Sequence, residues 1–179
     1  FELLDATNVK WGFSWSDVGF NTIGAGTYFA QEFLWNKQYA HFKFSFHDSG
    51  LAQYRPNVLG SDFASRLFKD YNGQTYWASF NPIHWFKPDS KFPEWINLSF
   101  GYSINNQLYG DGGTYIDVTN NLSFTPYRQY FLSFDVNFEA IPTDRRWLKL
   151  IFRGLNYIKV PFPALEFSQG KVGFRPLYF

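Results

Sequence analysis

Three polar side chains in one short segment are the arrangement that most suggests nucleophilic chemistry in this sequence. In the segment 41–48 (HFKFSFHD), the residues His41, Ser45 and His47 share one face of a predicted strand. Hydrolases pair such a serine nucleophile with a histidine base. Neighbours on one strand face lie about 6.6 Å apart along the backbone, too far for a direct hydrogen bond, and no Gly-x-Ser-x-Gly turn supports the serine. We therefore favour a polar strand face and keep a small lipid-acting enzyme as the alternative.

Metal and cofactor chemistry receive less support. His41 and His47 would lie about 20 Å apart at the ends of that strand and cannot share a metal ion, and the remaining histidine is His84. The absence of Cys excludes disulfides and Cys-ligated zinc. The run 110–113 (GDGG) lacks the other carboxylates of a calcium loop and the Lys-Ser/Thr of a phosphate loop, so it predicts a turn. We expect no catalytic residue, metal, cofactor or small-molecule substrate.

The composition favours one aromatic-rich domain over 1–179, with a helical part at about 1–37 and a β-rich part at about 38–179. Aromatic residues make up 23% of the 179 residues, which argues against disorder. No run of about 20 apolar residues exists, which argues against a helical membrane bundle. Sixteen basic and fifteen acidic residues leave a net charge of +1, so nucleic acid is not an expected partner. Because the chain begins at Phe1 and contains no Met, we expect a processed or partial product.

A helix is predicted over 16–35. Thr22, Gly26 and Ala30 recur at every fourth position, and such a ridge of small residues allows another backbone to approach closely. The uncharged part, between Asp17 and Glu32, is too short to span a bilayer. The helix is therefore interpreted as a buried core helix, with a helix lying at a membrane interface as the alternative.

Alternation of large apolar and small polar residues predicts several strands. In 96–104 (INLSFGYSI) every even position is large and apolar, and every odd position is small and polar or Gly. The same period runs through 130–138 and 42–46. Turn signals such as Asn120-Asn121 and Gln169-Gly170 separate further, shorter candidates. These candidates are 75–80, 114–118, 164–168 and 171–174.

Two more helices are predicted, over about 61–70 and between Pro142 and Pro161, the latter with Thr143 as its cap. Its apolar residues Leu148, Ile151, Leu155 and Ile158 would lie on one face. Five basic residues stand against one acidic residue between 143 and 159. A basic amphipathic helix with aromatic residues suits an anionic membrane or an acidic partner surface, although solvated charges are the plainer interpretation. The predicted partner contacts are Arg145, Arg146, Trp147 and Arg153.

Two architectures accommodate this strand pattern. The first, which we favour, is an α+β domain with an antiparallel, curved sheet and about three helices. The alternative is a small outer-membrane β-barrel with helical insertions. The favoured fold would bury the large residues of 96–104 in a protein core, whereas the barrel would turn them toward lipid. These residues are Ile96, Leu98, Phe100, Tyr102 and Ile104.

Several segments resemble one known family. The segment 11–17 (WGFSWSD), followed by the small-residue helix and 31–35 (QEFLW), resembles the Gly-(Phe/Trp)-Ser-Trp-x-Asp motif of YfiM-like bacterial envelope proteins. The segments 55–61 (RPNVLGS), 69–77 (KDYNGQTYW) and 163–179 resemble the longer version of that family, found in Gram-negative bacteria with a type IX secretion system. The family has no established activity.

The resemblance implies a non-enzymatic protein in the periplasm, associated with the outer membrane. Its expected partner is an outer-membrane translocon pore protein, and its expected role is that of a plug or accessory subunit that closes the periplasmic side of the pore. Exposed aromatic and Arg-rich surface would suit such a role.

Overall fold

The computed structural model describes residues 15–87, 89–118 and 120–179. It divides into two compact units, Phe1–Tyr39 and Ala40–Phe179. This division lies close to the expected boundary between the helical and β-rich parts, and that the two form one domain stays a prediction. Residues 11–14 of the first family motif lie outside the described residues.

The first unit contains helix α2 (Trp15–Trp35), which confirms the helix predicted over 16–35. The chain then turns at Asn36, in the left-handed region with φ 49°. Tyr39 folds back and its N–H donates to the Gln31 side chain at 2.9 Å. Phe29 and Phe33 are exposed, and the described part of this unit contains no second helix or strand against which α2 could pack. Burial of this helix in a core therefore stays a prediction.

Within the described part of the first unit, nothing packs on the small-residue ridge of α2. Thr22, Gly26 and Ala30 are not buried, and nothing lies within 4 Å of a Cβ placed on Gly26. Close packing of this ridge, against a partner or another helix, stays a prediction.

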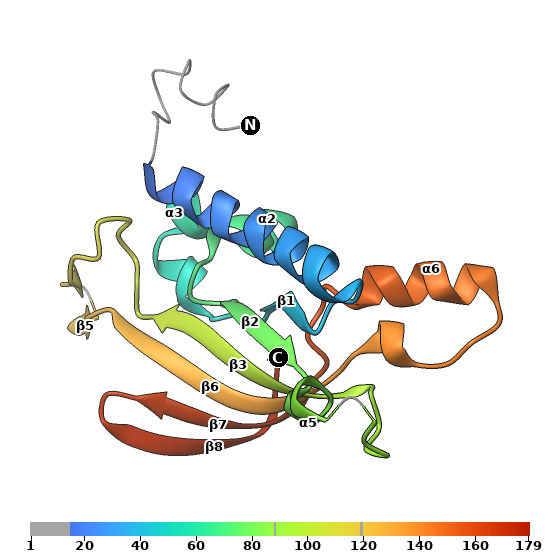
Figure 1. Cartoon of the computed structure of the whole chain (residues 1–179). Helices are drawn as coiled ribbons and strands as arrows, with labels where there is room; N and C mark the ends of the chain where they lie inside the picture. Colours follow the sequence, from blue (N-terminus) through green and yellow to red (C-terminus); the bar gives the residue numbers. More distant parts are fainter. Residues whose placement is uncertain (1–14, 88, 119) are drawn as a thin grey trace. The chain divides into compact units, whose positions relative to one another are not determined.

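The second unit is built on a six-stranded antiparallel sheet (Figure 1). In spatial order its strands are β1 (Ala40–Phe46), β2 (Gln74–Phe80), β3 (Ile96–Asn105), β6 (Tyr127–Val136), β7 (Phe162–Ser168) and β8 (Lys171–Tyr178). The edge strands β1 and β8 do not pair with each other, so the sheet stays open. This confirms the α+β class with an antiparallel sheet. A separate small hairpin joins β4 (Tyr115–Asp117) and β5 (Leu122–Phe124).

Turn chemistry explains how the strands are connected. Gln169 and Gly170 both have positive φ, 48° and 73°, as a two-residue hairpin turn requires. Asn121 has φ 53° in the turn before β5. The predicted turns at these positions are confirmed.

The helices of this unit agree only in part with the sequence. Helix α4 (Phe63–Lys69) is capped by Asp62, whose side chain accepts from the N–H of Ser65 in a capping box. Helix α6 (Arg146–Leu155) begins later than expected and its N-cap is Arg145, so the prediction of Thr143 as the cap is wrong. The short helical elements were not predicted: η1 (Leu51–Tyr54), α3 (Pro56–Leu59), α5 (Pro82–Phe86) and η2 (Phe138–Ala140).

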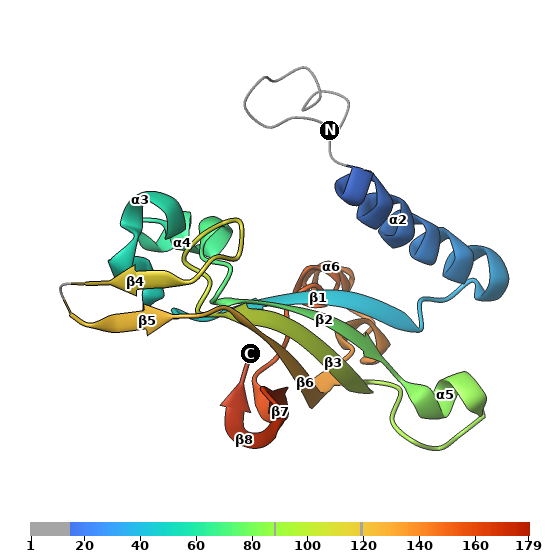
Figure 2. The same cartoon turned by 90° about the vertical axis from the view of Figure 1, so that its left-hand side faces the viewer.

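The sheet is strongly curved, as expected. The hydroxyls of Tyr178 on β8 and Thr75 on β2 lie 3.1 Å apart, although three strands separate β8 from β2 in the sheet. Figure 2 shows the β7–β8 hairpin turned away from the plane of β1, β2 and β3. The face that carries Thr75 and Tyr178 is therefore concave, and the opposite face is convex.

The sheet buries the face opposite to the one expected. On β3, Ser99 and Ser103 are buried on the concave side, whereas Phe100 on the convex side is 48% exposed. The favoured prediction, that the large residues at 96–104 fill a protein core, is therefore wrong. The concave side is closely packed at Gly101, where a Cβ would lie only 2.7 Å from the Trp77 ring. The concave core consists of Trp77, Phe131 and Ala164 with Tyr178.

Candidate functional site

The most extensive unusual feature of the second unit is the convex side of its sheet. Strand register aligns its outward side chains in three adjoining rows that contain no charged residue. Six strands about 4.8 Å apart make this face about 24 Å wide. We define the convex apolar face as Phe44, Tyr76, Tyr102, Tyr130, Phe167 and Val172, then Phe42, Ala78, Phe100, Leu132, Leu165 and Phe174, then Ala40, Phe80, Leu98 and Phe134.

Most large side chains of the convex apolar face are exposed. Phe42, Phe134 and Phe174 are each more than half exposed, and none of the members is buried. Antiparallel sheets in water normally turn their apolar face to the core and their polar face outward. Exposed apolar patches of this extent are typical of contact surfaces.

Helix α6 adds a second exposed surface. All four predicted contact residues are exposed, and Trp147 has 59% of its surface accessible. Leu150 and Ile151 are also exposed, so the apolar stripe of the helix is only partly covered. Another side of the helix is covered, because the Phe152 ring packs against the Phe138 ring with the centroids 5.9 Å apart. The helix therefore presents Arg145, Arg146 and Arg153 together with apolar side chains, and their role as partner contacts stays a prediction.

The segment after α6 attaches the helix to the β1 edge of the sheet. Phe44 N–H donates to the Tyr157 carbonyl at 2.9 Å, and Lys159 N–H donates to the Phe44 carbonyl at 3.0 Å. Ile158 pairs with Phe44 and is exposed, so it extends the convex apolar face toward α6. The prediction that Ile158 belongs to the helix is wrong, because the helix ends at Leu155.

The concave side holds a buried charge cluster. Asp135 of β6 lies between two lysines, with its carboxylate 2.8 Å from Lys43 Nζ and 4.0 Å from Lys159 Nζ. All three side chains are fully buried. Lys43 also donates to the Val136 carbonyl at 2.6 Å, and Lys159 donates to the carbonyls of residues 134 and 160. The cluster therefore ties β1, β6 and the segment before β7 together.

One carboxylate serves two ammonium groups, and this imbalance affects their protonation. Burial lowers the pKa of Lys159 to about 8, although Asp135 opposes the shift. Burial likewise lowers the pKa of Lys43, again against the attraction of Asp135. The sequence analysis missed this cluster. A signal existed, because Lys43 and Asp135 each lie between two large apolar residues of an alternating segment.

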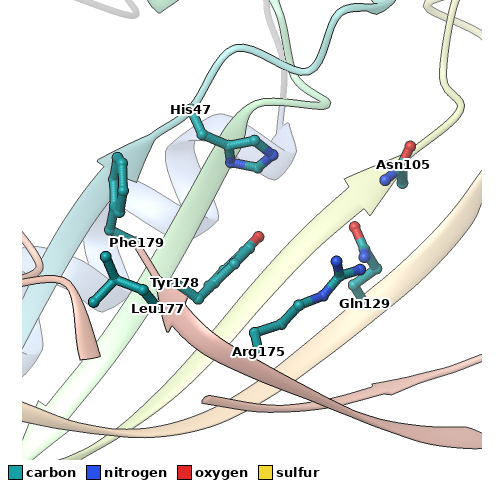
Figure 3. Close-up of a pocket in the computed structure, with 7 residues that line it drawn as sticks. All are labelled: His47, Asn105, Gln129, Arg175, Leu177, Tyr178 and Phe179. Carbon is teal, nitrogen blue, oxygen red and sulfur yellow. The ribbon is translucent and has the colours of Figure 1, made fainter. Parts of the chain in front are cut away.

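A pocket of about 320 Å³ opens at one end of the concave side (Figure 3). It is lined by His47, Asn105, Gln129, Arg175, Leu177, Tyr178 and Phe179. Its one charged lining residue is already paired, since Arg175 Nε donates to Glu166 at 2.7 Å. Burial raises the pKa of Tyr178 to about 12 and lowers the pKa of His47. The phenol is thus poorly suited to act as a base, and its bond to Thr75 positions the C-terminal strand.

The candidate hydrolase residues have structural partners. Ser45 Oγ accepts a hydrogen bond from the Trp77 indole at 2.8 Å and is buried. His41 lies beside Asn156, with Nδ1 and Nδ2 3.1 Å apart. His47 lies after the end of β1 and contacts the Tyr178 ring at 5.6 Å. The three residues therefore support three different neighbours rather than one reaction centre.

Residues of the segments 55–61 and 69–77 hold the end of the second unit where β3 passes into the β4–β5 hairpin. Arg55 donates to the Leu108 carbonyl at 2.9 Å. Asn72 donates to the Gln107 carbonyl at 2.9 Å and accepts from the Gln107 N–H at 2.7 Å. These residues fix a connection between distant segments, which gives the motifs a structural explanation.

The described residues contain no group of three or more His, Asp or Glu placed to hold a metal ion. Within the same residues, no helix combines the length and the hydrophobicity needed to cross a membrane. Comparison with known proteins adds no relative: no family model, no curated protein and no solved structure matches the chain.

Proposed function

We propose that this chain is a non-enzymatic binding protein of a bacterial envelope, an accessory or plug subunit that closes the periplasmic side of an outer-membrane secretion pore. The observation that carries the binding role is the convex apolar face, which has large aromatic side chains exposed over six strands. Surfaces of this kind on folded proteins mark contact sites. The resemblance to the YfiM-like envelope family narrows the location and the partner.

The contacts of the candidate nucleophile also support binding over hydrolysis. A serine nucleophile needs a base within hydrogen-bond reach and a hydroxyl that a substrate can approach. The Ser45 hydroxyl is instead buried under β2, where it accepts the Trp77 indole N–H. We therefore do not propose the lipid-acting enzyme.

Helix α6 is the proposed contact for the pore protein. Trp and Arg are the residue types that most often anchor interfaces, and Trp147 is exposed among three arginines on a helix whose Phe152 packs against Phe138 of η2. An acidic surface at the periplasmic mouth of the pore would complement this charge.

The test is co-purification from detergent-solubilised envelopes with the tagged chain. We expect a pore protein to be retained by the wild-type chain and lost from a variant that combines Arg145→Glu, Arg146→Glu and Arg153→Glu. The matched control combines Lys69→Glu, Lys87→Glu and Lys171→Glu, which reverses as many exposed charges away from α6. A chain that retains no pore protein, although it is folded, contradicts the proposal. Equal retention by both variants contradicts the role of α6.

A further inference from the structure

We infer that the convex apolar face lies against the acyl chains of a lipid membrane, within one leaflet. This deepens the proposed function by naming what the sheet contacts, and it rests on that function only for the presence of a membrane. The first argument is the reversed alternation. On β3 the inward side chains are small or polar and buried, and on β6 the polar residues Gln129, Ser133 and Asp135 are buried beside Phe131, the one large apolar side chain buried on that side. The side chains that these two strands contribute to the convex apolar face are large, apolar and not buried. Proteins place residues in this order where the surroundings are more apolar than the interior.

The second argument is shape. The 3.1 Å contact between Tyr178 and Thr75 requires a strongly curled sheet, so the apolar side is convex. Two convex faces touch only along a narrow strip, which makes a second copy of this chain a poor cover. Fluid acyl chains follow a convex surface without a matching shape.

The third argument is charge complementarity. The convex apolar face itself carries no charge in its three rows. Beside its β1 edge, α6 carries Arg146, Lys149 and Arg153, all exposed, together with exposed apolar residues. A basic amphipathic helix of this kind suits the headgroup region of an anionic leaflet. An apolar centre with a basic rim matches the layering of a membrane surface.

The unpaired edges of the sheet determine how deeply each strand can lie in the membrane. Among the described strands, β8 has a neighbour on one side only. Unpaired backbone groups are costly in hydrocarbon, where water cannot satisfy them. The edge strands should therefore stay near the headgroups while the central strands β3 and β6 lie deepest.

The chain has no Cys, so a single introduced Cys can be labelled without first removing native cysteines. An environment-sensitive fluorophore is attached to the full chain at Phe100→Cys or Phe134→Cys, both on the central strands. The control is Val118→Cys, 86% exposed and outside the six-stranded sheet. The purified chain, without any pore protein, is mixed with vesicles of phosphatidylcholine and phosphatidylglycerol that carry nitroxide on the acyl chains.

We expect the chain to float with the vesicles and the nitroxide to quench both central labels severalfold more than the control label. A chain that does not float, or central labels quenched no more than the control, overturns the inference. Central labels that are shielded without vesicles, with a doubled mass in solution, would indicate a second copy instead. Shielding that needs the pore protein would indicate a protein contact. The last two outcomes also overturn the lipid assignment, while co-purification still decides the proposed function.

Discussion

The two faces of the same sheet follow opposite rules. On β6, Phe131 points to the concave side and is 2% exposed, whereas Phe134, three residues later, points to the convex side and is 57% exposed. The concave side also buries Asp135 and Lys43, while the convex side exposes rows of aromatic rings. Burial in this molecule is therefore decided by the direction in which the sheet curls, since side chains of the same type are buried on one face and exposed on the other.

The comparison is tested most strongly by truncating one phenylalanine on each face. Phe131→Ala should lower the free energy of unfolding by about 3–5 kcal/mol, because its ring stacks on Tyr178 at 4.2 Å and leaves a cavity when removed. Phe134→Ala, the matched variant, should cost less than about 1 kcal/mol because its ring is exposed. Urea unfolding followed by Trp fluorescence measures both. Equal losses would mean that the two faces are buried alike.

The concave charge cluster provides the second test. Asp135→Asn leaves Lys43 and Lys159 without their shared carboxylate and should destabilise the chain by about 3 kcal/mol. Asp144→Asn removes an exposed carboxylate and should change stability by no more than about 0.5 kcal/mol. The same unfolding experiment compares them. A loss at Asp135 as small as that at Asp144 would show that the buried charges are not coupled.

The third test concerns the space that the concave side leaves for side chains. Gly101→Ala should destabilise by about 1–3 kcal/mol, because the new methyl would meet the Trp77 ring. Gly154→Ala in α6 meets nothing within 4 Å and should stabilise by about 0.5–1 kcal/mol through helix propensity. Combining Gly101→Ala with Trp77→Phe should recover part of the loss relative to Trp77→Phe alone. If the losses from Gly101→Ala and Trp77→Phe simply add in the double variant, the contact with the Trp77 ring is not the cause of the destabilisation.

The smallest effect is a pH dependence. Burial lowers the pKa of Lys159 from 10.5 to about 8. Between these two pH values the unfolded chain holds the proton and the folded chain releases it, so stability should rise with pH, by at most about 1.4 kcal/mol for each pH unit. Below about pH 8 both states are charged, and the folded chain bears the full cost of the buried ammonium.

The measurement is the free energy of unfolding across that pH range for the wild type and Lys159→Met. The variant should show a weaker rise, and what remains is expected from Lys43, whose pKa burial also lowers. Tyr178 acts in the opposite direction above about pH 10, because burial raises its pKa to about 12. An unchanged slope in Lys159→Met would assign the pH dependence to other groups.

The sequence by itself determined the local elements. Alternation with period two identified β3 and β6, and the helix predicted over about 61–70 anticipated α4. The hairpin turn at Gln169-Gly170 was readable because few residues other than Gly and Asn adopt positive φ at low cost. These features depend on neighbours within a few residues, which the sequence displays directly.

Only the tertiary structure decided which face of the sheet is inside. A period of two separates two sets of side chains but does not say toward which side the sheet curls. The curl brings Tyr178 to Thr75, and it encloses Lys43, Asp135 and Lys159 from three distant segments. The candidate contact surface follows from that choice, because burying the small polar set leaves the aromatic set outside.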